Sequence, residues 1–157
     1  MDRKKIRHIL CAVRGIPQSR ETATKAIDLA IEHQARLTFV HVNNADFLLT
    51  AGPTMTSLTK IKKQIHSLGE FAMLVLCDRA NRRGVENVDY ILRDGRVLPQ
   101  IQETISELKP DVLVIGRPFV IDPGLFSLDE TDVENFIQEI ENNLNIKVIP
   151  VEAKAEQ

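Results

Sequence analysis

Apolar residues follow two patterns that alternate along the chain. Compact apolar runs are typical of strands covered on both faces of a sheet, whereas apolar positions that recur every three or four residues mark one face of a helix. The strand-like segments are His8–Val13, Leu37–Val42, Val88–Leu92, Asp111–Gly116 and Ile146–Val151. The helical stripes lie within 23–31, 58–75, 97–108 and 133–144. The predicted element order is therefore β-α-β-α-β-α-β-α-β.

Glycine and proline separate these segments. Gly84 ends the second helix, Asp94-Gly95 forms a turn, and Pro110 stops the third helix. Strands that alternate with helical crossovers predict a parallel sheet with helices on both faces. Apolar and polar residues alternate in Val88–Leu92, which indicates a half-exposed edge strand. Pro150 lacks an amide donor and therefore places the last strand at an edge or a bulge.

Composition indicates one globular domain, predicted over 1–157 with a core of about 5–152 and a polar tail. The 157 residues are 43% hydrophobic and 27% charged, and the net charge is −2. No overall positive field attracts nucleic acid or an anionic membrane, so neither is an expected partner. Apolar stretches are too short for a signal peptide or a membrane span. We expect a cytoplasmic protein.

Enzymatic and metal chemistry find little support in the sequence. Cys11 and Cys77 lie in apolar segments and are interpreted as reduced thiols. The four histidines lack metal-ligand spacing, and His41 is interpreted as a hydrogen-bonded core residue. Lys60, Lys62 and Lys63 are interpreted as a solvated helix face. Because no Ser-His-Asp arrangement or Walker loop can be assembled, we expect no catalytic residues, no enzyme activity and no bound metal.

Ligands of open parallel sheets bind beyond the carboxyl ends of the strands, where the strand order reverses. The segments that follow the first four predicted strands are Arg14-Gly15-Ile16-Pro17, Asn43-Asn44, Arg93-Asp94-Gly95-Arg96 and Gly116-Arg117-Pro118-Phe119. Any single glycine among them is more simply explained as part of a plain β-to-α turn.

Two stretches resemble the universal stress protein (UspA-like) family. The first stretch runs from Ile9–Val13 through the following helix to Leu37–Val42. The second runs from Leu92-Arg93-Asp94-Gly95 through the following helix to Lys109–Gly116. The resemblance covers essentially the whole chain. It implies a doubly wound α/β fold of the HUP/UspA-like type, with a five-stranded parallel sheet in the order 3-2-1-4-5. It also implies a homodimer formed through the last strand, with Ile146, Val148 and Val151 as contact residues.

The sequence departs from the ATP-binding branch of that family at its functional positions. That branch has an acidic residue after the first strand, where this chain has Arg14. It also uses a loop of the form Gly-x-x-Gly-x9-Gly-Ser/Thr, in which Gly116 matches the first glycine. Phe119, Asp129 and Glu130 occupy the remaining three positions. The phosphate loop is therefore degenerate.

Acidic residues crowd the start of the last predicted helix. Asp129, Glu130, Asp132 and Glu134 complement the positive end of the helix dipole, which in ATP-binding proteins attracts phosphate. A triphosphate at this position would meet like charge at short range. Tight ATP binding in the family's usual pose is therefore not expected.

Arg14 and Arg117 follow strands that are neighbours in the family's strand order. They could pair with Asp122, Asp129 or Glu130 and plug the pocket, bind a small anion, or remain solvated. The candidate pocket comprises Val13, Arg14, Gly15, Val42, Gly116, Arg117, Gly124 and Ser127.

The favoured hypothesis is a non-enzymatic stress-response or regulatory module without a cofactor. The alternative is a modified site for ATP or AMP. Backbone near Val13 and Val42 would then hold adenine, and the phosphates would lie against Gly116, Arg117, Gly124 and Ser127.

Overall fold

The computed structural model describes residues 5–14, 20–43, 55–116 and 130–152. Its strands are β1 (His8–Val13), β2 (Arg36–Asn43), β3 (Val88–Asp94), β4 (Val112–Gly116) and β5 (Lys147–Val151). Its helices are α1 (Arg20–His33), α3 (Met55–Arg83), α4 (Val97–Leu108) and α5 (Glu130–Leu144). The order of these elements confirms the alternation predicted from the sequence.

The strands form one parallel sheet in the order β3-β2-β1-β4-β5, as predicted. The chain moves outward from β1 to β3 and then returns to β4 on the other side of β1. The carboxyl ends of β1 and β4 are therefore adjacent where the strand order reverses. This is the position at which open α/β sheets bind ligands.

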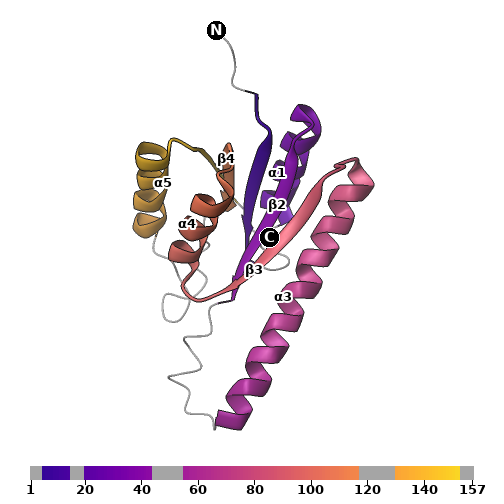
Figure 1. The fold of residues 1–157 in the computed structure, drawn as a ribbon, viewed down its shortest axis with the longest axis vertical. Coiled ribbons are helices and arrows are strands. Elements are labelled where there is room, and N and C mark those ends of the chain that lie inside the picture. Colours follow the sequence, from indigo (N-terminus) through magenta and orange to yellow (C-terminus); the bar gives the residue numbers. More distant parts are fainter. Residues whose placement is uncertain (1–4, 15–19, 44–54, 117–129, 153–157) are drawn as a thin grey trace.

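The sheet separates two apolar cores. Helices cover both of its faces (Figure 1). Ile9, Cys11 and Val13 point to the face covered by α1 and α3, whereas Leu10 and Ala12 point to the face covered by α4 and α5. Successive residues of a strand point to opposite faces, and here both faces are covered. This explains why the β1 segment is almost continuously apolar in the sequence.

Both edge strands match the sequence-based expectations. β3 is partly exposed along most of its length, and Pro150 is exposed on β5, the strand at the other edge. An exposed edge leaves one row of backbone groups without a neighbouring strand, so a proline is tolerated there.

Helix α3 packs on the sheet through a different stripe from the one its apolar pattern suggests. The buried residues of this face are Gly69, Ala72, Met73, Leu76 and Ala80. Leu68 and Val75, which belong to the predicted apolar stripe, are exposed. A Cβ at Gly69 would lie 3.1 Å from Asn43 Oδ1 and 3.1 Å from the His41 ring, so the small residue allows α3 to approach the sheet closely.

A polar network joins three strands at the opposite, amino end of the sheet. The Thr38 hydroxyl donates to Asp89 Oδ1 at 2.6 Å and lies 2.8 Å from His8 Nε2. Arg36 forms a 2.7 Å ion pair with Asp89. Burial, together with the charge of Arg36, lowers the pKa of His8 below its ordinary 6.5. Burial alone would raise the pKa of Asp89, but the hydrogen bonds from Thr38 and Arg36 outweigh it and lower that pKa.

Candidate ligand site at the carboxyl edge of the sheet

The fold brings four of the predicted site residues to one edge of the sheet. Val13 ends β1 and Arg14 follows it, Val42 lies near the end of β2, and Gly116 ends β4. Ala12 is in register with Ile115, so Val13 and Gly116 are the next residues on neighbouring strands. The other four predicted residues, Gly15, Arg117, Gly124 and Ser127, lie outside the described residues, as do the proposed arginine partners Asp122 and Asp129.

The strand ends at this edge are packed. Val13 and Val42 are both buried. His41 Nδ1 lies 3.1 Å from the carbonyl oxygen of Val13, and because a carbonyl can only accept, the ring nitrogen is the donor. His41 is half-buried and hydrogen-bonded, which agrees with its interpretation as a structural histidine. One acceptor at the end of β1 is therefore already used within the protein.

Arg14 occupies the position where the ATP-binding branch of the family has an acidic residue. Its side chain is partly buried, and desolvation lowers the pKa of the guanidinium below its ordinary 12.5. The guanidinium nevertheless carries its positive charge at neutral pH, because arginine starts from so high a pKa. The chain thus places a desolvated cation at this edge, where that branch has an anion.

Gly116 has a packing role that the sequence did not reveal. A Cβ built at this position would lie 2.7 Å from Thr22 Oγ1, closer than real Cβ contacts. Thr22 is buried in the first turn of α1, and its carbonyl oxygen accepts a 3.8 Å contact from Cys11 Sγ. The glycine therefore lets α1 pack tightly against the end of β4. This steric requirement accounts for Gly116 without any phosphate.

Side-chain contacts also join the ends of β2 and β3. The amide of Gly95 donates to the carbonyl of Asn43 at 3.0 Å, and Asn43 Nδ2 lies 3.4 Å from Asp94 Oδ1. Gly95 has φ +133°, which requires glycine at this turn. Asn43 is buried, and its Oδ1 has no hydrogen-bond partner among the described residues. The sequence pattern had marked Asn43 only as a residue that follows a strand.

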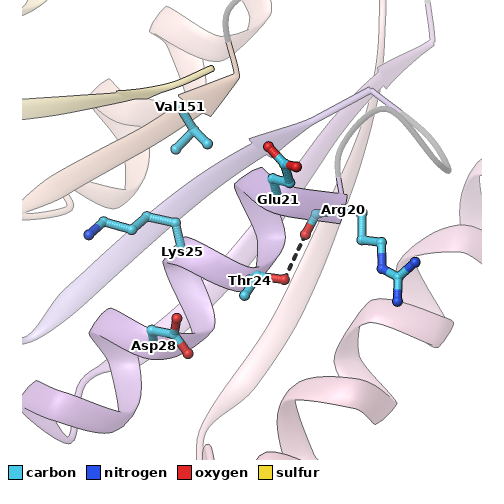
Figure 2. A pocket seen from close by; sticks show the side chains of 6 residues that line it. All are labelled: Arg20, Glu21, Thr24, Lys25, Asp28 and Val151. Atoms are coloured by element: carbon cyan, nitrogen blue, oxygen red, sulfur yellow. Dashed lines mark hydrogen bonds between the residues drawn. The ribbon is translucent and has the colours of Figure 1, made fainter. Parts of the chain in front are cut away.

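The hollow in Figure 2 lies on the outer side of α1, where it adjoins Val151 at the end of β5. Its lining also includes Arg20, Glu21, Lys25 and Asp28. These charges are of mixed sign and lie along the exposed side of the helix, so they do not form a field that would select a cation or an anion. Of the predicted site residues, the four that the structure describes (Val13, Arg14, Val42 and Gly116) do not line this hollow.

Residues 5–14, 20–43, 55–116 and 130–152 contain neither a metal-binding cluster nor a membrane-spanning helix. Within these ranges, no group of three or more His, Cys, Asp or Glu side chains could hold a metal ion. None of the helices there is both long enough and apolar enough to cross a bilayer. Cys11 and Cys77 are both free thiols.

The chain belongs to the universal stress protein family. The model of that family matches residues 5–118, which is more than half of the 157-residue chain. This match and the strand order confirm the resemblance found in the sequence. No curated protein matches the chain.

Solved universal stress proteins share this fold at low sequence identity. UspA from Lactobacillus plantarum superposes with a TM-score of 0.74 and 18% identity, over 95% of this chain and 99% of that one. A universal stress protein in complex with cAMP superposes with a TM-score of 0.64 and 15% identity, over 96% of this chain and 100% of that one. An Arabidopsis thaliana universal stress protein with AMP bound superposes with a TM-score of 0.57 and 12% identity, over 95% of this chain and 93% of that one. At these identities the similarity establishes the fold.

Proposed function

We propose that this chain is a non-enzymatic stress-response or regulatory module that does not bind ATP in the usual mode of its family. The observation that carries the proposal is the chemistry of the carboxyl edge. A partly buried arginine stands where the ATP-binding branch has an acid, and one acceptor at the end of β1 already binds a side chain. The module acts without a cofactor and in the cytoplasm.

The packing of Gly116 supports the same conclusion. In the family's phosphate loop this glycine is useful because its backbone can approach a phosphate. Here the contact with Thr22 gives a sufficient reason for a glycine, so its match to the motif is weak support for a nucleotide. The remaining loop positions, Phe119, Asp129 and Glu130, do not match the motif at all.

Nucleotide binding in a modified site is the alternative function. Two structural neighbours hold cAMP and AMP, ligands with a single phosphate that do not require a triphosphate cradle. Arg14 would supply a counter-charge for one phosphate. Under this alternative the protein binds AMP or cAMP and still discriminates against ATP.

Thermal denaturation with Mg-ATP, AMP, cAMP and phosphate separates these functions. The proposal predicts no stabilisation of the wild-type protein by any of the four at 1 mM. In Arg14→Asp, the acidic residue of the ATP-binding branch is restored, and some adenosine affinity should return. Arg14→Gln is the matched control, since it removes the cation without adding the acid. Stabilisation of the wild type by AMP or cAMP that Arg14→Gln abolishes would establish the alternative and contradict the proposal.

We further propose a homodimer formed through β5. This strand lies at the edge of the sheet, where its outer backbone groups can pair with a second copy. Ile146 and Val148, two of the three expected contact residues, are buried in the protomer's own core beneath α5. Lys147 and Pro150 are exposed on β5, and its partly exposed apolar side chains are those of Ile149 and Val151, which also pack against the core on the α1 side of the sheet. We therefore assign the side-chain contacts to these two residues.

Sedimentation velocity tests the dimer directly. The wild-type protein should sediment at about 35 kDa, twice the 17.7 kDa protomer. Ile149→Asp with Val151→Asp should give a folded monomer, because two carboxylates would be buried at the two-fold contact. Phe71→Asp, on a helix that covers the other edge of the sheet, is the control and should leave the dimer intact. A wild-type monomer at 50 μM, or a dimer that survives the double substitution, would refute this assignment.

A further inference from the structure

An apolar patch on α3 is exposed to solvent. We define the α3 patch as Leu68, Phe71, Leu74 and Val75, whose side chains are 69%, 65%, 51% and 40% exposed. Spacings of three and four residues place them along one side of the helix, away from the buried side formed around Met73 and Leu76. Their combined exposed area is on the order of 400 Å², which lies within the range of functional patches on monomeric proteins.

Two residues of the patch, Leu68 and Val75, belong to a heptad-like repeat that extends towards the amino end of the helix. Apolar residues occur at 58, 61, 65, 68, 72 and 75, with strictly alternating spacings of three and four. A 3.5-residue period is the sequence signature of a helix that pairs with another helix. The face that packs on the sheet uses different positions, except for Ala72. The second stripe is therefore not explained by the docking of α3 on its own sheet.

Figure 1 shows how far α3 extends past the sheet. The amino-terminal half of α3 continues beyond the carboxyl edge of the sheet, and Gly69 marks the level at which it passes the end of β2. Leu58, Ile61 and Ile65 are half-buried on this projecting part, and exposure rises sharply at Leu68. A partner helix could thus lie along the patch without displacing any contact between α3 and the sheet.

The charges on α3 favour an acidic partner. The helix carries six basic and two acidic side chains, a net charge of +4 in a chain whose total is −2. Asp78 pairs with Arg82, and Glu70 accepts a hydrogen bond from Tyr90. Lys60, Lys62 and Lys63 are exposed, and none of them forms an ion pair with another described residue. Basic charge without a counter-ion among the described residues therefore adjoins the apolar patch.

These features argue against a second copy of the chain as the occupant. Basic residues occur towards both ends of α3, so antiparallel pairing of two such helices would bring Lys60 and Lys63 towards Arg82 and Arg83 of the partner copy. The patch also supplies only about half of the roughly 800 Å² per partner that a standard interface buries. A single amphipathic helix fits this area better.

We propose that the α3 patch binds an amphipathic helix of a partner protein, with apolar residues at heptad spacing and acidic residues on its flanks. The apolar side chains of the partner cover Leu68, Phe71 and Val75, and its carboxylates face Lys60 and Lys63. This site is distinct from the candidate pocket at the carboxyl edge of the sheet. If the protein is a regulatory module, the α3 patch is the surface through which it would bind its target protein.

Fluorescence anisotropy with a designed probe tests the site on the intact protein. The probe is a fluorescein-labelled 21-residue helical peptide with Leu and Ile at the a and d positions and Glu at e and g. The acidic peptide should bind the wild-type protein more tightly than the same peptide with Lys at e and g, and its affinity should fall as salt rises. Equal binding of the two peptides, or no binding of the acidic one, contradicts the proposal.

Surface variants identify the binding face. Leu68→Gln with Phe71→Gln should weaken the acidic peptide by about tenfold or more, because two apolar contacts are lost. Ile31→Gln is the matched control, because Ile31 is an exposed apolar residue (38%) on α1 and should leave the affinity unchanged. Lys60→Glu with Lys63→Glu should reverse the preference in favour of the basic peptide.

Two further measurements decide between occupants. If the Leu68→Gln/Phe71→Gln protein loses a dimer that the wild type forms in sedimentation, a second copy covers the patch and the proposal is wrong. Likewise, co-sedimentation with phosphatidylserine vesicles that these substitutions abolish would assign the patch to a membrane. The proposal predicts that neither the wild-type mass nor vesicle binding changes with the substitutions.

Discussion

Replacing Gly116 with alanine tests whether packing or phosphate binding requires this glycine. The added Cβ would lie 2.7 Å from Thr22 Oγ1 and 3.8 Å from Thr22 Cβ. Thr22 is buried, and it belongs to a helix that packs against the centre of the sheet, so its hydroxyl has little room to withdraw. The clash is therefore with a constrained atom.

Overpacking a tightly packed position costs about 1–3 kcal/mol. For a chain of this length, each kcal/mol lowers the melting temperature by about 2–4 °C, so Gly116→Ala should melt several degrees below the wild type. Thr22→Ala removes the obstructing oxygen. In the double variant, the alanine at 116 should therefore cost about 1–2 kcal/mol less than it does beside Thr22.

Urea denaturation of the four proteins gives this coupling free energy as a double-mutant cycle. Thr22→Ser is the control: it keeps the hydroxyl oxygen, so it should do little to reduce the destabilisation caused by Gly116→Ala. A Gly116→Ala protein as stable as the wild type, or a cycle with no coupling, would refute the packing explanation for the glycine.

Three other predictions concern local chemistry. Burial and the charge of Arg36 hold the pKa of His8 below 6.5 in the folded protein, so the free energy of unfolding, measured with urea, should fall as the pH drops from 6.5 through that pKa. His8→Gln should flatten this pH dependence. An unchanged slope in the variant would contradict the prediction. Gly95→Ala and Gly84→Ala both force alanine to positive φ, but only at Gly95 would the added Cβ also contact a side chain, that of Gln100. Gly95→Ala should therefore lower the melting temperature more than Gly84→Ala. Equal decreases would contradict this prediction. Burial and the charge of Asp89 raise the pKa of Cys77 to about 11, and burial raises the pKa of Cys11 further. A thiol reagent should therefore label Cys77 before Cys11. Faster labelling of Cys11 would contradict this prediction.

The element order and the sheet class were predictable from the sequence because they depend on local periodicity. The β1 and β4 segments are almost wholly apolar, which only a strand covered on both faces requires. The face of α3 was not predictable in the same way. Its buried face includes Gly69, Ala72, Met73 and Leu76, whereas Leu68 and Val75 of the predicted stripe are exposed. Size and hydrophobicity therefore did not distinguish the buried positions of α3 from the exposed ones.

The candidate site was predictable only as far as topology decides it. Val13, Arg14 and Gly116 could be placed together because parallel strands end at the same edge. The contacts between Gly116 and Thr22 and between His41 and Val13 depend on the distance between elements, which the sequence pattern does not contain.

The network at the amino end of the sheet was missed for a related reason. His8, Thr38 and Asp89 lie on three different strands, and they meet only through the strand register. Each is unremarkable in the sequence, because a single polar residue near a strand end predicts no partner.

Isothermal titration of the purified wild-type protein with Mg-ATP tests the central claim most directly. The claim is that the carboxyl edge, with Arg14 partly buried beside the ends of β1 and β4, does not bind the triphosphate. The titration should give only the heat of dilution up to millimolar nucleotide. A saturating one-to-one isotherm with a micromolar Kd would contradict the account.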